Sequence, residues 1–318
     1  MNYRPLGRTG LSVSELAFGG VEIGIPYGIG VSGSQDMPDE ASSIALLQSA
    51  LDQGINFFDT ARAYGRSEAL IGKAFSGQRE RVVLCSKCGQ PLPQDGTPVQ
   101  ASQIATTIER SLQDSLSALQ TDYLDVYLLH SADLATLAND AIADVFLALK
   151  RRGVVRAIGV STYTVAETAL VIDQGIWDVI QLSFNLMDQR QGRLFERAQK
   201  NGVGLMVRSV LLKGVLSDKG RNLHPALQGV EAHRQVYQES LDEQKLTLSS
   251  LAIKFALSFS AVSAILVGID RMSYLQQALT TVDGFYFQGE VLSRLQRLGF
   301  PDPEFIDLRR WDQMGWLK

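Results

Sequence analysis

Short runs rich in β-branched and aromatic residues alternate with amphipathic stretches along almost the whole chain. This alternation is typical of repeated strand–helix units, which fold into a parallel sheet covered by helices. The stretches at residues 41–53, 103–119, 141–151 and 248–259 carry apolar side chains at helical spacing. The eight expected strands are residues 14–20, 55–61, 82–88, 123–130, 154–162, 179–185, 204–211 and 264–270.

Eight strands with intervening helices predict an α/β fold of the closed (β/α)8 type, a TIM barrel, formed as a single domain over residues 1–318. No linker and no change in composition divides the chain. The alternative is an open doubly wound sheet, which needs a glycine-rich phosphate turn after an early strand. Gly28, Gly30 and Gly33 lack the required G-x-G-x-x-G spacing, so the closed barrel is favoured.

Composition excludes several classes of protein. The apolar fraction of 45% and the charged fraction of 20% are those of a soluble globular chain. The net charge is -4, with Lys and Arg dispersed, so no basic stripe for nucleic acid is present. The longest uncharged stretch, residues 255–269, is too short to span a membrane and indicates a buried helix running into a buried strand. The first residues lack the apolar core of a signal peptide, so we expect a cytoplasmic protein.

The two cysteines, Cys85 and Cys88, stand three residues apart in an expected strand. Side chains at this spacing point to opposite faces of a strand, so the sulfurs should diverge and serve in packing. No second Cys pair or nearby His completes a zinc site, and we expect no bound metal.

Polar side chains stand near the ends of the expected strands. Asp59 ends INFFD, Lys87 lies in VVLCSKC, His130 ends YLDVYLLH, and Gln181 lies inside VIQLSFN. Each of them alone has a structural explanation, such as capping a loop or bonding to the backbone. Because the carboxyl ends of barrel strands form the active site, we expect the acid, the amine and the imidazole to converge on one cavity.

Tyr64 follows Asp59 by five residues, just beyond the strand end. A phenol has a pKa near ~10, which is too high for easy proton donation at neutral pH. A nearby ammonium group lowers that pKa, and a carboxylate holds the ammonium group in place and charged. Asp59, Lys87 and Tyr64 therefore form a coherent acid/base chain.

The segment GINFFDTARAYGRSEALIG, residues 54–72, resembles the most specific signature of the aldo-keto reductase family. LGRTGLSVSELAFGG near the start, LLHS and GVST also resemble recurring segments of that family, in the right order. The resemblance implies an oxidoreductase that transfers a hydride between NAD(P)H and a small carbonyl compound, namely an aldehyde, a ketone or a sugar lactol. It also implies a hairpin-like N-terminal segment and a long loop with an extra helix after the seventh strand.

Four residues match the catalytic tetrad of the family one by one: Asp59, Tyr64, Lys87 and His130. By this resemblance, Tyr64 is the general acid in reduction and the general base in oxidation. Lys87 tunes Tyr64, Asp59 orients Lys87, and His130 directs the substrate oxygen.

The resemblance also implies a nicotinamide site, with departures from the family pattern. Ser161 and Gln181 would hold the carboxamide, but Thr162 stands where Asn is usual. Arg208 stands where an aromatic ring often stacks on the nicotinamide. The segment expected to receive the pyrophosphate contributes Ser209, Leu211 and Gly214.

The adenosine end departs further, because Gln277 and Ala278 replace the usual Glu and Asn. Arg271 is available for a 2′-phosphate, although Asp270 beside it would repel one. The sequence therefore leans toward NADP(H), with NAD(H) as the alternative.

Two other functions stay open. A Schiff-base lyase or aldolase would use Lys87 as a nucleophilic amine, which a neighbouring Asp59 opposes by keeping it protonated. A sensor or regulatory protein would retain the cofactor site with little turnover, as channel-associated members of the family suggest. Substrate specificity is expected to lie in the loops at residues 24–37, 131–137 and 212–245 and in the C-terminal tail, where Trp311 and Trp316 either wall the pocket or cover the barrel.

Overall fold

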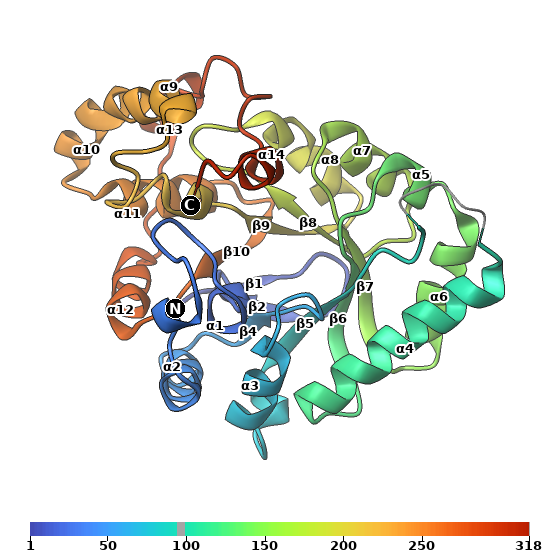
Figure 1. Cartoon of the computed structure of the whole chain (residues 1–318). Coiled ribbons are helices and arrows are strands. Elements are labelled where there is room, and N and C mark those ends of the chain that lie inside the picture. Colours follow the sequence, from blue (N-terminus) through green and yellow to red (C-terminus); the bar gives the residue numbers. More distant parts are fainter. Residues whose placement is uncertain (94–98, 318) are drawn as a thin grey trace.

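The computed structural model describes residues 1–93 and 99–317. Eight parallel strands close into a barrel in the order β10-β3-β4-β5-β6-β7-β8-β9, as Figure 1 shows. The predicted (β/α)8 barrel is therefore confirmed, and all eight expected strands occur. The last strand is displaced by two residues toward the N-terminus, since it spans residues 262–268 and not 264–270. The strands are β3 (Leu16–Gly19), β4 (Phe57–Asp59), β5 (Val83–Cys88), β6 (Leu124–Leu129), β7 (Val155–Ser161), β8 (Val179–Ser183), β9 (Gly204–Arg208) and β10 (Val262–Gly268).

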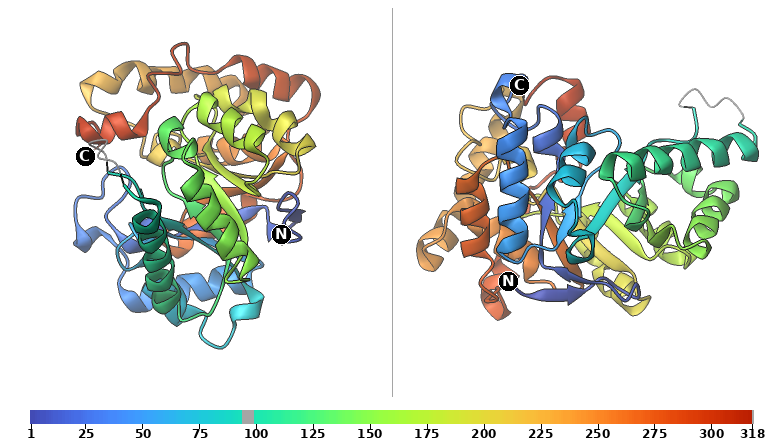
Figure 2. Two further views of the ribbon diagram at one scale, coloured as in Figure 1. Left: turned by 90° about the vertical axis from the view of Figure 1, so that its right-hand side faces the viewer. Right: turned by 90° about the horizontal axis from the view of Figure 1, so that it is seen from below.

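Helices surround these strands in all views (Figure 2). Several begin at side-chain caps, for example at Asp39, Thr164 and Thr247, whose oxygens accept a backbone N–H of the first turn. No helix in the described part of the chain is long and apolar enough to cross a membrane. The helices are α1 (Val21–Gly24), α2 (Glu40–Asp52), α3 (Ser67–Ala74), α4 (Ala101–Leu119), α5 (Leu134–Leu137), α6 (Asp140–Arg151), α7 (Val165–Gln174), α8 (Phe195–Lys200), α9 (Gln228–His233), α10 (Gln238–Gln244), α11 (Leu248–Leu257), α12 (Met272–Thr281), α13 (Gly289–Arg297) and α14 (Leu308–Gln313).

The core has two layers, because successive side chains of a strand point to opposite faces. In β5, Val83 and Cys85 belong to the cluster inside the barrel, and Cys88 belongs to the larger cluster between strands and helices. The two sulfurs therefore diverge, as the sequence predicts. Lys87 has the same parity as Val83 and Cys85, so its side chain points into the barrel interior.

A hairpin of β1 (Tyr3–Pro5) and β2 (Ser12–Ser14) precedes the barrel. Leu6, Leu11 and Val13 of this segment pack in the same cluster as the inward-facing barrel residues. The hairpin therefore closes the amino-terminal end of the barrel and leaves the carboxyl ends of the strands open for the site.

The long connection after β9, which the sequence predicts, contains α9 and α10 together with 3-10 turns at Leu212–Gly214, Pro225–Leu227 and Arg234–Tyr237. In Figure 1 these helices lie beside α13, and α14 lies between them and the barrel mouth. An ion pair between Lys213 and Asp312 joins the connection to α14. The C-terminal tail thus lies against the same end of the barrel as the polar strand ends.

Gly7 of the hairpin loop provides a test of how the barrel is closed. It has φ +53, and a Cβ there would lie 2.3 Å from the backbone nitrogen of Gly204. Gly10 has φ +74 with nothing within 4 Å of its Cβ position. We expect Gly10→Ala to cost about 1–2 kcal/mol from the left-handed backbone alone, and Gly7→Ala to cost roughly 1–3 kcal/mol more from the clash. Urea unfolding measures the free energy of unfolding of both variants. Equal losses of this free energy in Gly7→Ala and Gly10→Ala would contradict the close contact between Gly7 and Gly204.

Candidate active site

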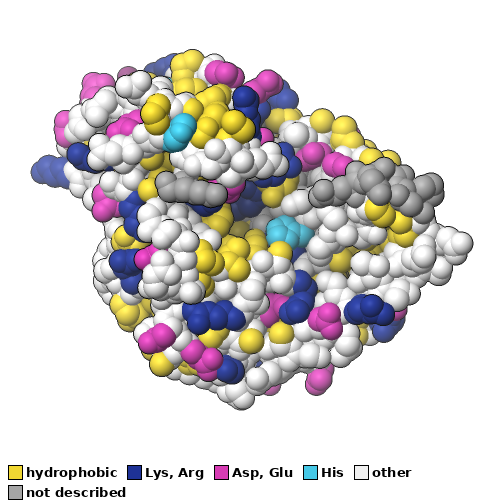
Figure 3. All heavy atoms as spheres, viewed as in Figure 1, with side chains coloured by type: hydrophobic (Ala, Val, Ile, Leu, Met, Phe, Trp, Pro, Cys, Tyr) yellow, Lys and Arg dark blue, Asp and Glu magenta, His cyan; other side chains and the backbone are white. Residues whose placement is uncertain are grey.

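The polar residues at the strand ends converge on one cleft at the carboxyl end of the barrel, with a volume of about 340 Å³. A hollow is visible on this face in Figure 3, with hydrophobic and histidine side chains at its floor. Asp59, Tyr64, His130, Ser161 and Gln181 all line the cleft. Of the acid, the amine and the imidazole predicted to converge there, Asp59 and His130 line the cleft. The amine of Lys87 does not line it but lies beneath, in contact with Asp59.

Lys87 and Asp59 form a buried ion pair. The Lys87 side chain is fully buried, and its Nζ donates to Asp59 Oδ2 at 2.7 Å and to the Thr60 carbonyl at 2.8 Å. The other oxygen of Asp59 accepts a hydrogen bond from Gln181 Nε2 at 2.9 Å. The amide nitrogen of Gln181, expected at the nicotinamide, is thus engaged with Asp59, a contact that the sequence does not reveal.

The charge of Lys87 follows from these contacts. Burial favours the neutral amine, but Asp59, followed by Tyr64 and Cys85, raises the pKa of Lys87 above its usual range. Lys87 is therefore an ammonium group at neutral pH. Such a group is not nucleophilic, which opposes the Schiff-base alternative.

Tyr64 lies in the loop between β4 and α3, and its ring lies above the Lys87 ammonium group. Nζ of Lys87 is 4.8 Å from the centroid of the Tyr64 ring. Burial raises the pKa of Tyr64, and Lys87 acts in the opposite direction without cancelling that effect. The expected lowering by the ammonium group is therefore present, but burial exceeds it, and Tyr64 remains a phenol at neutral pH.

His130 follows β6 and meets Tyr64 edge-to-face, with ring centroids 5.7 Å apart and an interplanar angle of 85°. Burial, together with the positive charges of Lys87 and Arg208, lowers the pKa of His130 to about 3. The imidazole is therefore neutral at physiological pH. A neutral imidazole can donate one hydrogen bond to an oxygen atom that enters the cleft beside Tyr64.

Most residues expected at a dinucleotide line this cleft, and two do not. Thr162 is buried, and its hydroxyl is hydrogen-bonded to the hydroxyl of Thr168 at 2.7 Å. Arg271 forms a two-point ion pair with Asp270, at 3.0 Å for each contact, and Asp270 reaches the cleft while Arg271 does not. The expected residues that line the cleft are Ser161, Gln181, Arg208, Ser209, Leu211, Gly214 and Gln277.

Arg208 ends β9 and is held by neutral groups. Its guanidinium carbon lies 4.2 Å from the centroid of the Tyr163 ring, and its nitrogens donate to the Thr162 carbonyl at 3.0 Å and to Ser209 Oγ at 3.3 Å. Within residues 1–93 and 99–317, no carboxylate forms an ion pair with it. Arg208 is therefore a cation that stacks on an aromatic ring, next to Tyr64 and His130.

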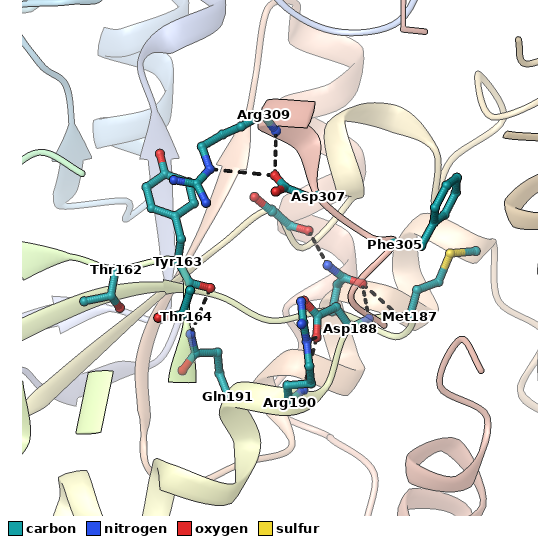
Figure 4. A network of polar contacts seen from close by, with 12 residues as sticks. Thr162, Tyr163, Thr164, Met187, Asp188, Arg190, Gln191, Phe305, Asp307 and Arg309 are labelled. Atoms are coloured by element: carbon teal, nitrogen blue, oxygen red, sulfur yellow. Dashed lines mark hydrogen bonds and ion pairs between the residues drawn. The ribbon is translucent and has the colours of Figure 1, made fainter. Parts of the chain in front are cut away.

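The tail also reaches Tyr163, but not through its tryptophans. Figure 4 shows Arg309 of α14 over the Tyr163 ring, and its guanidinium carbon lies 3.7 Å from the ring centroid. Trp311 is buried, and Trp316 stacks on His224; neither lines the cleft. The tail therefore borders the cleft through Leu308, Arg309 and Asp312.

Glu22 is a residue of the cleft that sequence reasoning missed. It lies in α1, directly after β3, and its Oε2 is buried with no hydrogen-bond partner in the described structure. Burial is the main cause that raises the pKa of Glu22 to about 8, followed by the charges of Asp270 and Asp59. The sequence does carry a signal, because a lone acid in the apolar run Val21–Gly24 after a strand resembles the pattern around Asp59.

The residues of the cleft fit an elongated, partly anionic molecule such as a nicotinamide dinucleotide. The segment after β9 contributes backbone and the lysines Lys213 and Lys219, and β10 contributes Gly268. A Cβ at Gly268 would lie 1.7 Å from Oε1 of Glu22, so a side chain at this position would displace the Glu22 carboxyl. Among the described residues, no group of three or more metal-ligating side chains is present.

Known proteins resemble this chain over nearly its full length. The model of the Aldo/keto reductase family matches residues 15–299. L-galactose dehydrogenase of Arabidopsis thaliana is 27% identical and covers 93% of both chains. The uncharacterized oxidoreductase YrpG of Bacillus subtilis is 30% identical, covering 95% of this chain and 97% of its own. The holo form of an aldo-keto reductase from Bacillus halodurans superposes with a TM-score of 0.79 at 27% identity, covering 94% and 96% of the two chains.

The buried carboxyl of Glu22 should make stability depend on pH. The pKa of Glu22 is about 8 in the folded chain against 4.5 for the unperturbed group, so unfolding releases a proton between these values. Wild type should therefore lose stability relative to Glu22→Gln as pH rises from about 4.5 to 8. Melting temperatures between pH 5 and 9 measure this margin. Glu40→Gln, which removes an exposed acid paired with Lys73, is the control. If the difference in melting temperature between wild type and Glu22→Gln did not change with pH, the raised pKa of Glu22 would be contradicted.

Proposed function

Because the chain belongs to the aldo/keto reductase family, we propose that it is an NAD(P)H-dependent carbonyl reductase in which Tyr64 exchanges the proton with the substrate oxygen. Carbonyl reduction by an oxidoreductase is the reaction that its family and relatives support. The observation that carries the finer proposal is the charged pair of Lys87 and Asp59 beneath the Tyr64 ring.

Tyr64 is the general acid in reduction and the general base in oxidation. Burial keeps the phenol protonated, so it can donate its proton to a carbonyl oxygen beside it. The Lys87 ammonium group stabilises the phenolate that remains, because a positive charge near a developing anion lowers its energy. Asp59 and the Thr60 carbonyl fix that ammonium group, so they act through Lys87.

His130 orients the carbonyl oxygen. Its imidazole is neutral and meets Tyr64 edge-to-face, so a hydrogen bond from its ring N–H can direct the oxygen toward the phenol. The Tyr64 phenol and the His130 N–H both donate to the carbonyl oxygen and polarise the carbonyl. Because both groups are neutral, the Lys87 ammonium group stays the full positive charge beneath them. We assign His130 this positioning role.

The cofactor supplies the hydride when it is bound. We assign Ser161, Gln181 and Arg208 to its nicotinamide end, and Thr162 acts there through its carbonyl, which fixes Arg208. Ser209, Leu211 and Gly214 are assigned to the pyrophosphate, and Arg271 and Gln277 to the adenosine end. Because Arg271 is cationic and half exposed beside Asp270, we favour NADP(H) over NAD(H).

The substrate is proposed to be a small carbonyl compound or a sugar lactol, reduced by a single-domain cytoplasmic enzyme. Tyr27, Tyr64 and Tyr163 give the cleft aromatic and hydroxyl surface suited to a polyhydroxylated ring. The similarity to L-galactose dehydrogenase supports including sugars among the substrates to be tested.

Removing the Tyr64 hydroxyl should separate binding from chemistry. Tyr64→Phe should retain cofactor binding and lose turnover to about one per cent of wild type or less, because a positioned acid contributes roughly 10²- to 10⁴-fold. Fluorescence titration with NADPH and steady-state reduction of a panel of aldehydes and sugars measure the two effects. A Tyr64→Phe protein that turns over at nearly the wild-type rate would sink the assignment of Tyr64 as the acid.

Removing the Lys87 ammonium group should weaken Tyr64 as the acid/base. Lys87→Met should lose turnover to a similar extent, and its residual activity in the oxidation direction should require higher pH, since the Tyr64 phenolate loses its stabilising charge. The pH dependence of turnover for wild type and Lys87→Met measures this displacement. An unchanged profile would show that Lys87 does not act on Tyr64.

Arg271 should discriminate between the two dinucleotides. Arg271→Ala should weaken NADPH binding at least tenfold more than NADH binding, since a charge-assisted contact to a phosphate is worth roughly 1.5–3 kcal/mol. Dissociation constants for both cofactors decide the matter. Equal losses for NADPH and NADH would remove the argument for NADP(H).

A further inference from the structure

Glu22 combines three features that structural packing does not explain. It carries an ionisable group in a largely buried place, one carboxyl oxygen has no partner in the described residues, and the group lines the cleft. Burying a carboxylate with an unpartnered oxygen costs much more stability than burying the neutral acid, so burial favours the protonated form. Glycine at residue 268 accommodates this carboxyl, whose Oε1 fills the space a Cβ would need. The carboxyl therefore lies against Gly268 in the wall of the cleft.

Charged groups from several elements surround Glu22. Asp59 at the end of β4 and Asp270 after β10 oppose its ionisation, whereas Lys219 in the segment after β9 favours it. Tyr27 lies in the loop after α1, and its pKa is raised mainly by burial and next by the charge of Glu22. From the start of α3, Arg66 donates to the Ile23 carbonyl, so its guanidinium bonds to the α1 backbone. Two carboxylates thus face Glu22 against one lysine.

We propose that Glu22 is a cofactor-binding residue that meets the diphosphate of the nicotinamide dinucleotide as a neutral carboxylic acid, donating its O–H to a phosphate oxygen. This inference rests on the proposed function, which assigns the dinucleotide to this cleft. The Glu22 carboxyl lies against Gly268 of β10, and both residues line the same cleft as Ser209, Leu211 and Gly214, which we assign to the pyrophosphate. A carboxylate here would repel the phosphates, whereas a protonated acid supplies the donor that a phosphate oxygen accepts.

Proton balance makes the proposal measurable. Well below pH 8, Glu22 already carries its proton and the dinucleotide binds without exchange of a proton. Above that pH the carboxylate must take one proton from solvent for each dinucleotide bound, so the dissociation constant should rise toward about tenfold per pH unit. The other shifted groups of the cleft titrate elsewhere. The pKa of His130 is about 3, and the pKa values of Tyr27, Tyr64 and Lys87 are raised above their usual ranges.

The experiment is calorimetric titration of the whole protein with NADH between pH 6.5 and 9.5, in buffers of different ionisation enthalpy. NADH lacks a 2′-phosphate that would itself titrate, and NADPH above pH 7.5 repeats the measurement. For wild type, proton uptake should rise from near zero toward one per dinucleotide. Glu22→Gln, whose amide donates without titrating, should take up no proton and bind within about threefold of wild type at pH 7. A melting curve establishes that the variant is folded.

Asp270→Asn is the matched control, because it removes another carboxyl of the same cleft. Its proton uptake should persist and begin at lower pH, since Asp270 raises the pKa of Glu22. Unchanged proton uptake in Glu22→Gln overturns the inference. A wild type that takes up no proton across this pH range also overturns the inference, whatever the affinity of Glu22→Gln. In both cases the dinucleotide still binds, whereas absence of binding by wild type at every pH overturns the proposed function itself.

Discussion

The ion pair between Lys87 and Asp59 is the interaction on which the rest of the site depends. Both side chains are almost wholly buried, and a buried charge is tolerated only with a partner and with its remaining hydrogen bonds satisfied. Here the partners come from three strands, because Lys87 lies in β5, Asp59 ends β4, and Gln181 reaches Asp59 from β8. The barrel must close in this register for the pair to form. Fold and chemistry are thus fixed by the same contacts.

The ion pair has no net charge, and around it burial decides which groups of the cleft stay uncharged. Tyr64 stays a phenol because burial raises its pKa more than the Lys87 charge lowers it. His130 stays a neutral imidazole because burial and the Lys87 charge both lower its pKa. Arg208 is a cation of the cleft that stacks on Tyr163. Glu22 is an acid of the cleft whose pKa is raised mainly by burial, so its protonation changes the charge beside Asp270 and Asp59. In the function we propose, this cleft accepts an anionic dinucleotide and presents two hydrogen-bond donors to a carbonyl oxygen.

The sequence predicts the barrel and the convergence at its mouth, since both follow from periodicity and from polar residues that end apolar strands. Asp59, Lys87 and His130 were accessible in this way, and so was the divergence of Cys85 from Cys88. Contacts between side chains distant in the sequence were not accessible. No local pattern shows that Gln181 donates to Asp59, that the Thr162 hydroxyl turns to Thr168, or that Arg309 of the tail reaches Tyr163. Glu22 carried a local signal, but its isolation becomes visible only when Gly268 of the last strand is placed against it.

The central claim is that Asp59 keeps Lys87 charged beneath Tyr64. It is tested most directly by the pH dependence of single-turnover carbonyl reduction in Asp59→Asn at saturating reduced cofactor. For wild type the rate should be nearly constant from pH 6 to 9, because the pKa of His130 lies at about 3 and those of Lys87 and Tyr64 are raised. In Asp59→Asn, burial acts on Lys87 without its carboxylate, so the rate should fall as pH rises and the amine loses its proton. If Asp59→Asn reacted as fast as wild type and its rate did not change with pH, the account would be contradicted.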